Sequence, residues 1–407
     1  MEFIVSGLLL LTYSIHTFCR TKLLLPSVVF CIMWGIAFML CGLIQSDYIF
    51  ADVKQRFNFV YVNQYCLYFA ISSIVGFKIA HLRKHTFFYD CISACNLREI
   101  LDKYRWIMYI TFLIGIICIF LFIIHFGITS YSQYRLVFVT TEKPPLLSFI
   151  FRIGNYSVLL ASIYVLLLGL YHGKTKVDNK ELITNFILFS TPLMSTGGRL
   201  FIFYFFVYYL SSFSIGRYSE VDKSFISKEE MNKLIPFFAL LFSLVSFLAI
   251  LRTEGEQSNS KASHKYLYFT DGIRTTDFCI KKFEGNLSYE YGKNSFFPKG
   301  GDNMKRFRKY MSGGPLGATV YSILVPLYLD FGMVLSLFVW CFIAFIIEWI
   351  ALLMIHNITI INFVIYLLLT KIMYESVIFN CLSQNYYFIQ LIVLLYIFRK
   401  RIFPELY

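Results

Sequence analysis

An arginine follows two glycines in the middle of a long apolar stretch, at PLMSTGGRLF, residues 192–201. A charged side chain costs roughly 2.5 to 3.5 kcal/mol at the centre of a membrane-spanning helix, so it usually has a partner or binds a ligand. Gly197 and Gly198 would let backbone N–H groups approach the same anion as the Arg199 guanidinium. This cluster therefore predicts an anion site. The alternative is an interfacial arginine at a tight turn.

Three further arginines adjoin apolar runs on the same expected face. Arg252, in LRTEGE, has Glu254 beside it, so a salt bridge at the base of a loop competes with ligand binding. Arg135 follows two tyrosines in YSQYRLVF, and Arg152 lies a few residues into the next apolar run. For Arg135 and Arg152 the alternative to substrate binding is contact with lipid headgroups.

Asp330 stands near the end of GGPLGATVYSILVPLYLDFG, residues 313–332. Pro315 and Pro326 interrupt helices, which predicts a short outer-face helix, a turn and then a full span. An acid/base role, the orientation of an arginine and a helix N-cap all fit Asp330 at this place.

The elements that must position these residues are membrane helices. The chain is 58% hydrophobic and only 15% charged, which excludes an ordinary soluble domain. We expect an all-α polytopic integral membrane protein with about 11 transmembrane helices and one large outward loop. The expected spans are 3–18, 24–45, 60–80, 106–128, 148–171, 182–197, 199–214, 235–251, 319–354 with a break near Asp330, 361–379 and 384–398. Whether 182–214 crosses twice or re-enters stays open.

Basic residues predict the orientation of these spans. They gather in the short connectors 81–105, 172–181 and 215–234 and in the C-terminal tail, which places that side in the cytoplasm. The large loop then faces out. We expect an N-terminal bundle over 1–251, the loop over 252–318 and C-terminal helices over 319–407.

The large loop carries many aromatic residues, so we expect a small folded cap and not a disordered segment. Its excess of lysine and arginine beside aromatic faces suits a sugar attached to a phosphate, and a solvated loop facing lipid headgroups is the alternative. Arg274 in the loop and Tyr321 just after it are further candidates for substrate binding. No nucleic-acid motif, P-loop, dinucleotide fingerprint or Cys/His metal spacing occurs, so we expect no nucleic-acid partner, no cofactor and no metal site.

Together these motifs resemble the O-antigen polymerase family, also called oligosaccharide repeat unit polymerases. The resemblance rests on spans flanking STGGR, an outer-loop YxxYR, an arginine opening the large loop, and the closing TVYSILVPLYLDFG. It covers most of the chain as an arrangement.

The resemblance implies a metal-independent inverting glycosyltransferase of lipopolysaccharide biosynthesis in the bacterial inner membrane, with its large loop in the periplasm. It would transfer a glycan from undecaprenyl pyrophosphate onto a lipid-linked repeat unit, with a polysaccharide chain-length regulator as partner. Arg199 and Arg252 would bind the pyrophosphate leaving group, Arg135 would assist at the second lipid carrier, and the loop would hold acceptor sugars.

Two other functions stay open. The related O-antigen ligases place a histidine before the late spans, but GGPLGATVYSILV has none, which disfavours a ligase and leaves the catalytic base unassigned. A flippase or transporter would use charges inside the spans, and Lys371 and Glu375 are such charges. An intrahelical pair, one turn apart, is the simpler interpretation of these two residues.

Overall fold

All regular secondary structure that the computed structural model describes is helical. The structure describes residues 2–44, 60–82, 94–129, 144–194, 200–218, 267–285, 287–297, 300–310, 321–356 and 360–377. Within these ranges four segments are long and apolar enough to cross a membrane, namely Glu2–Thr21, Pro26–Leu43, Leu97–Phe126 and Leu324–Ile355. The all-helical class is therefore confirmed for the described residues, the four apolar helices support a membrane protein, and the count of about 11 spans stays a prediction.

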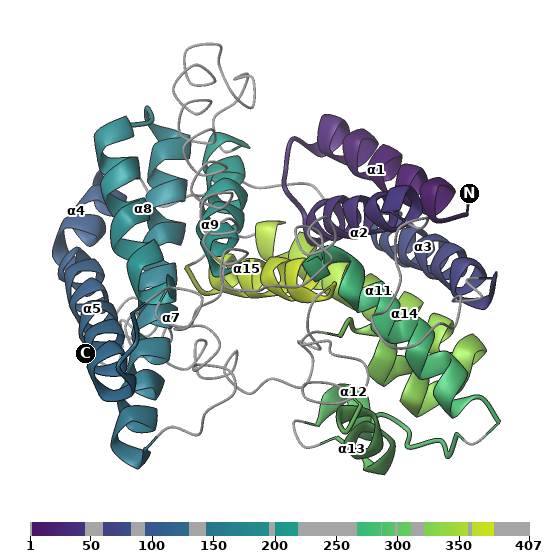
Figure 1. The fold of residues 1–407 in the computed structure, drawn as a ribbon. Helices are drawn as coiled ribbons and strands as arrows, with labels where there is room; N and C mark the ends of the chain where they lie inside the picture. Colours follow the sequence, from purple (N-terminus) through teal and green to yellow (C-terminus); the bar gives the residue numbers. More distant parts are fainter. Residues whose placement is uncertain are drawn as a thin grey trace, which may run out of the picture. The chain divides into compact units, whose positions relative to one another are not determined.

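Contacts divide the chain into two compact units (Figure 1). The first unit joins Met1–Phe88 to Ala262–Ile392, and the second joins Tyr89–Lys261 to Val393–Tyr407. The described helices of the first unit are α1 (Glu2–Thr21), α2 (Pro26–Ile44), α3 (Val60–His81), α11 (Leu267–Phe283), α12 (Lys293–Phe296), α13 (Asp302–Arg308), α14 (Leu324–His356) and α15 (Ile360–Glu375). Those of the second are α4 (Ala94–Tyr104), α5 (Trp106–Phe126), α7 (Pro145–Lys174), α8 (Asn179–Met194) and α9 (Leu200–Tyr218).

Large aromatic side chains fill the first unit where α2, α3 and α14 meet. Trp34 of α2 and Trp340 of α14 both pack on Phe69 of α3, with ring centroids 4.8 and 5.2 Å apart. Each indole also finds a buried acceptor: Trp340 Nε1 donates to Ser73 Oγ at 2.7 Å and Trp34 Nε1 donates to Ser376 Oγ at 2.8 Å. These bonds remove the penalty of burying an indole N–H, and the bond to Ser376 links the residue that follows α15 to the same core.

Helix α14 consists of two helices joined at Gly332, where φ is 70° and ψ is −173°. Only glycine adopts this backbone conformation readily. The expected break near Asp330 is therefore confirmed, two residues further along the chain. The Tyr289 ring fills the space beside the glycine, since a Cβ there would lie 3.0 Å from Tyr289 Cε1.

Small residues let α7 and α9 touch backbone to backbone in the second unit. A Cβ atom added to Gly169 would lie 2.1 Å from Ser212 Oγ, which is too close for any side chain. A Cβ atom on Gly173 would lie 2.5 Å from the Phe213 carbonyl oxygen. A Cβ atom on Gly216 would lie 2.4 Å from the Leu170 carbonyl oxygen. These small residues are spaced one helical turn apart along each helix, as in close-packed pairs of membrane helices.

The described part of the large loop is folded, as its aromatic content predicts. Its helices α11, α12 and α13 all contact α14, and α11 also contacts α2 and α3. Ile273, Phe283, Met304 and Phe307 are buried in this part of the first unit. Apolar burial of this kind offsets the chain entropy that would otherwise leave a polar loop unfolded.

Candidate functional site

Most of the predicted site residues lie outside the described part of the chain. These are Arg135, Gly197, Gly198, Arg199 and Arg252. Arg152 lies on α7 and Arg274 on α11, where only the backbone is described. Of the predicted set, the side chains of Asp330 and Tyr321 are described. The structure therefore bears on the part of the expected site that joins the large loop to α14.

Asp330 fastens α12 to α14. Its Oδ1 accepts hydrogen bonds from Asn294 N–H at 3.0 Å and from Asn294 Nδ2 at 2.9 Å. Its Oδ2 accepts from Ser295 N–H at 2.7 Å and from Ser295 Oγ at 2.6 Å. Asp330, on α14, therefore caps the N-terminus of α12, and its carboxylate does not serve as the N-cap of α14. We call Asp330, Asn294 and Ser295 the Asp330 clamp.

Glu290 extends the clamp to α13. Its carboxylate accepts Asn294 Nδ2 at 2.7 Å, Asp302 N–H at 2.6 Å and Asn303 N–H at 3.2 Å. Asn294 Oδ1 in turn accepts Gly301 N–H at 2.8 Å. Two carboxylates thus satisfy free N–H groups at the beginnings of two consecutive short helices, where negative charge is favourable.

This geometry gives Asp330 a positioning function. The side chain is fully buried, and both oxygens accept two hydrogen bonds each within the first unit. Tyr321, half-buried, packs against the loop with its ring edge-to-face to Phe307 of α13 at 6.0 Å between centroids. Both residues therefore help to hold the loop, and a role for either one in catalysis or substrate binding stays a prediction.

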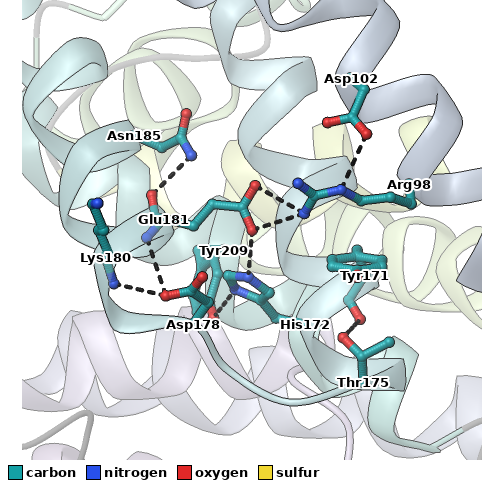
Figure 2. A network of polar contacts seen from close by, with 10 residues as sticks. All are labelled: Arg98, Asp102, Tyr171, His172, Thr175, Asp178, Lys180, Glu181, Asn185 and Tyr209. Atoms are coloured by element: carbon teal, nitrogen blue, oxygen red, sulfur yellow. Dashed lines mark hydrogen bonds and ion pairs between the residues drawn. The ribbon is translucent and has the colours of Figure 1, made fainter.

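A second polar cluster lies in the second unit, around Glu181 at the start of α8 (Figure 2). Arg98 Nη1 of α4 donates to both Glu181 oxygens at 3.2 Å, and His172 Nε2 lies 3.3 Å from Glu181 Oε2. The other ring nitrogen of His172 lies 2.9 Å from the Tyr209 hydroxyl on α9. We call these four residues the Glu181 network. It joins α4, α7, α8 and α9. The basic residues in the short connectors predict that this end of the unit is cytoplasmic.

The partners of Glu181 keep its carboxylate ionised. The hydrogen bond with His172 lowers the pKa of Glu181, and the charges of His172 and Arg98 act in the same direction against the effect of burial. Arg98 also lies over the Tyr171 ring, 5.6 Å from its centroid, and bonds Asp102 one turn along α4. A planar guanidinium suits these simultaneous contacts better than a lysine ammonium does.

A third buried carboxylate, Glu348, lies near the end of α14. It accepts Ser27 N–H at 2.9 Å and Ser27 Oγ at 2.5 Å, and His81 Nε2 lies 2.8 Å from its Oε1. These bonds join the start of α2 and the end of α3 to the far end of α14. That proximity is the one expected if successive spans alternate in direction.

The sequence interpretation missed Glu181, His172 and Glu348. A signal was present for Glu348, which is the only charge in the apolar run WCFIAFIIEWIALL, and such a residue usually has a partner. Glu181 and His172 lie among lysines in a short connector, so nothing in their local pattern separates them from solvated residues. Their proximity depends on how α7, α8 and α9 pack.

Lys371 and Glu375 form a pair on one helix face of α15. Lys371 Nζ lies 3.6 Å from Glu375 Oε1, and both side chains are buried. The intrahelical interpretation of these two charges is confirmed.

No protein-family model, curated protein or solved structure matches this chain. The function must therefore be argued from its own residues.

Proposed function

We propose that this chain is an oligosaccharide repeat unit polymerase of the O-antigen type. It works at the periplasmic face of the bacterial inner membrane, where it transfers a growing glycan from undecaprenyl pyrophosphate onto a single lipid-linked repeat unit. The observation that carries the proposal is the folded part of the large loop that the structure describes, fixed by the Asp330 clamp to an apolar helix long enough to span a membrane. A folded polar element beside a membrane helix suits an enzyme whose sugars are in water while its carriers are in lipid.

The reaction in this proposal needs positive charge at the leaving group. An acceptor hydroxyl attacks the anomeric carbon of the donor glycan, the bond from that carbon to the phosphate oxygen breaks, and undecaprenyl pyrophosphate leaves. Arg199 and Arg252 bind the pyrophosphate and stabilise the charge that develops on it. The base that takes the hydroxyl proton is unassigned. Since both oxygens of Asp330 accept hydrogen bonds, we assign that residue to positioning the loop.

The remaining candidates have supporting roles. Arg135 contacts the second lipid carrier, with Gly197 and Gly198 lending backbone N–H groups to the anion. Arg152, Arg274 and Tyr321 contact sugars or phosphates around the loop. A chain-length regulator is the expected protein partner, since the enzyme repeats one transfer many times.

The first test is the ladder of surface polysaccharide on a denaturing gel. A strain lacking the gene is complemented with wild type, with Arg199→Ala or with the control Lys305→Ala, which changes an exposed cation on α13. We expect wild type and the control to restore the ladder, while Arg199→Ala leaves the lipid core capped with one repeat unit. Equal amounts of each protein in the membrane fraction exclude an effect on folding.

The same strain separates the alternatives. Full-length polymer accumulating on the lipid carrier in the deletion strain would identify a ligase. Single repeat units accumulating on the cytoplasmic face would identify a flippase. A normal ladder in the deletion strain would contradict all three functions.

A further inference from the structure

Four aromatic side chains stand exposed on α12 and on the residues that flank it. Tyr289 is 56%, Tyr291 76%, Phe296 43% and Phe297 62% exposed. We call these four residues the aromatic rim. Large aromatic side chains gathered on an exposed surface are uncommon unless the surface meets another apolar phase.

The backbone holds the rim in place. Tyr291 has a φ of 46°, which a residue with a large side chain rarely adopts, and it directly precedes the α12 turn. The Asp330 clamp fixes the next residues, Asn294 and Ser295, with hydrogen bonds of 2.6 to 3.0 Å. Lys293 N–H donates to the Glu290 carbonyl oxygen at 3.2 Å and closes a turn over Tyr291 and Gly292, so the turn and the clamp together fix where the Tyr291 side chain lies.

The rim lies beside the beginning of an exposed apolar face on α14. The Tyr289 ring packs beside Gly332, at the kink of α14. From there Val334, Phe338 and Phe342 follow one another at helical spacing, each more than half exposed. Since α14 is long and apolar enough to span a membrane, we expect this face to meet lipid. The rim therefore lies where that face ends.

Hydrogen bonding in the turn favours lipid over sugar as the occupant. A sugar site pairs aromatic faces with polar groups that bind hydroxyls. Here the Asn294 amide, the Ser295 hydroxyl, the Glu290 carboxylate and the Asn303 amide all bond inside the protein. The exposed side chains that the structure describes between residues 288 and 297 are Ser288, the four aromatic residues and Lys293, and aromatic rings beside an ammonium suit the headgroup region of a bilayer.

We propose that the aromatic rim is an interfacial anchor, which inserts into the boundary between headgroups and acyl chains in the leaflet next to the α14 kink. The rings lie among the upper acyl chains, and Lys293 reaches the lipid phosphates. The anchor fixes the height of the large loop above the bilayer. This inference does not depend on the proposed polymerase activity.

The test uses the full chain in lipid nanodiscs, with tryptophan as a reporter at two exposed rim positions. Tyr291→Trp and Phe297→Trp are compared with Lys305→Trp on α13, and the emission of the parent, which has four tryptophans, is subtracted. We expect the rim reporters to emit at shorter wavelength and to be quenched by lipids brominated near the carbonyl end of the acyl chain. The Lys305→Trp reporter should be quenched only by acrylamide from the water.

Two results would overturn the anchor. If both rim reporters respond to acrylamide like the control and ignore the brominated lipid, the rim faces water. If soluble oligosaccharide protects the reporters from acrylamide while brominated lipid has no effect, the rim binds glycan. Because neither readout needs enzyme turnover, failure of the anchor is distinguishable from failure of the polymerase.

Discussion

The Asp330 clamp and the Glu181 network each bury a carboxylate, but they stabilise it by different physical means. Asp330 accepts four hydrogen bonds from the amides and hydroxyl of two adjacent residues, and no ion pair to it occurs among the described residues. Glu181 bonds a guanidinium and an imidazole from two other helices. The first arrangement depends on the shape of one short turn, and the second on the charge of groups brought together by packing.

This contrast indicates what each cluster fixes. Neutral donors on one turn specify a local backbone conformation, so the Asp330 clamp determines the position of a loop. Bonds to Glu181 from the Arg98 guanidinium and the His172 ring, on two separate helices, specify which helices lie together, so the Glu181 network determines an arrangement of helices. Substitutions and pH should therefore affect the two clusters differently.

The largest effect should come from Asp330→Ala. The substitution leaves the N–H groups of Asn294 and Ser295 buried without acceptors, which should lower the local free energy of unfolding by about 3–5 kcal/mol. Hydrogen exchange should then lose protection over residues 289–297 and keep it on α2 and α3. The control is Asp302→Ala, an exposed aspartate on α13. Unchanged protection over 289–297 would show that the clamp does not hold the loop.

Glu181→Gln should have a smaller effect, about 1–3 kcal/mol, since Arg98 is partly exposed and water screens its charge. The amide keeps the shape of the side chain but removes the negative charge of the carboxylate that Arg98 and His172 both contact. Hydrogen exchange of α4 and of the start of α8 should rise together. Glu99→Gln, an exposed glutamate on α4, is the matched control. If exchange rises on α8 alone, the network does not hold α4.

Acid should affect the network in the same direction as Glu181→Gln. The folded pKa of Glu181 lies below its ordinary value of 4.5, so its ionised form stabilises the fold above that pH. This stabilisation should be lost as the pH falls through the folded pKa. The unfolding temperature should therefore fall more steeply with decreasing pH for wild type than for Glu181→Gln. Parallel curves would exclude Glu181 as a source of the pH dependence.

Arg98→Lys should have the smallest effect, about 0.5–1 kcal/mol, because the charge remains while the two-oxygen contact is lost. Contact with the Tyr171 ring weakens as well. Exchange on α4 should rise modestly. A loss as large as that of Glu181→Gln would mean that the geometry of the guanidinium, more than its charge, holds α4.

Much of the helical layout was predictable because apolar runs of sufficient length have few other solutions in a membrane. The expected spans 24–45, 60–80 and 106–128 correspond to α2, α3 and α5 within a few residues. The helices α4 and α11 were not expected as helices, since each carries many charges and neither meets the length and hydropathy of a span. Their burial against other helices decides their conformation.

The candidate site was less predictable. Asp330 was identified from its place after Pro326, but its partners Asn294 and Ser295 lie far away in the chain, and no local pattern links them. The sequence equally hides that His172 lies between Glu181 and Tyr209. Such pairings follow from tertiary packing, which hydropathy and local spacing do not encode.

The close contact between α7 and α9 also bears on how the chain enters the membrane during synthesis. Helix α8, between them, has 16 residues and begins with Asn179, Lys180 and Glu181, so it is a poor candidate for release into lipid by itself. Helix α8 contacts both neighbours. Helix α5, which is made earlier and packs against α8, can shelter α8 as soon as it emerges, and we expect the glycine faces of α7 and α9 to meet when α9 follows.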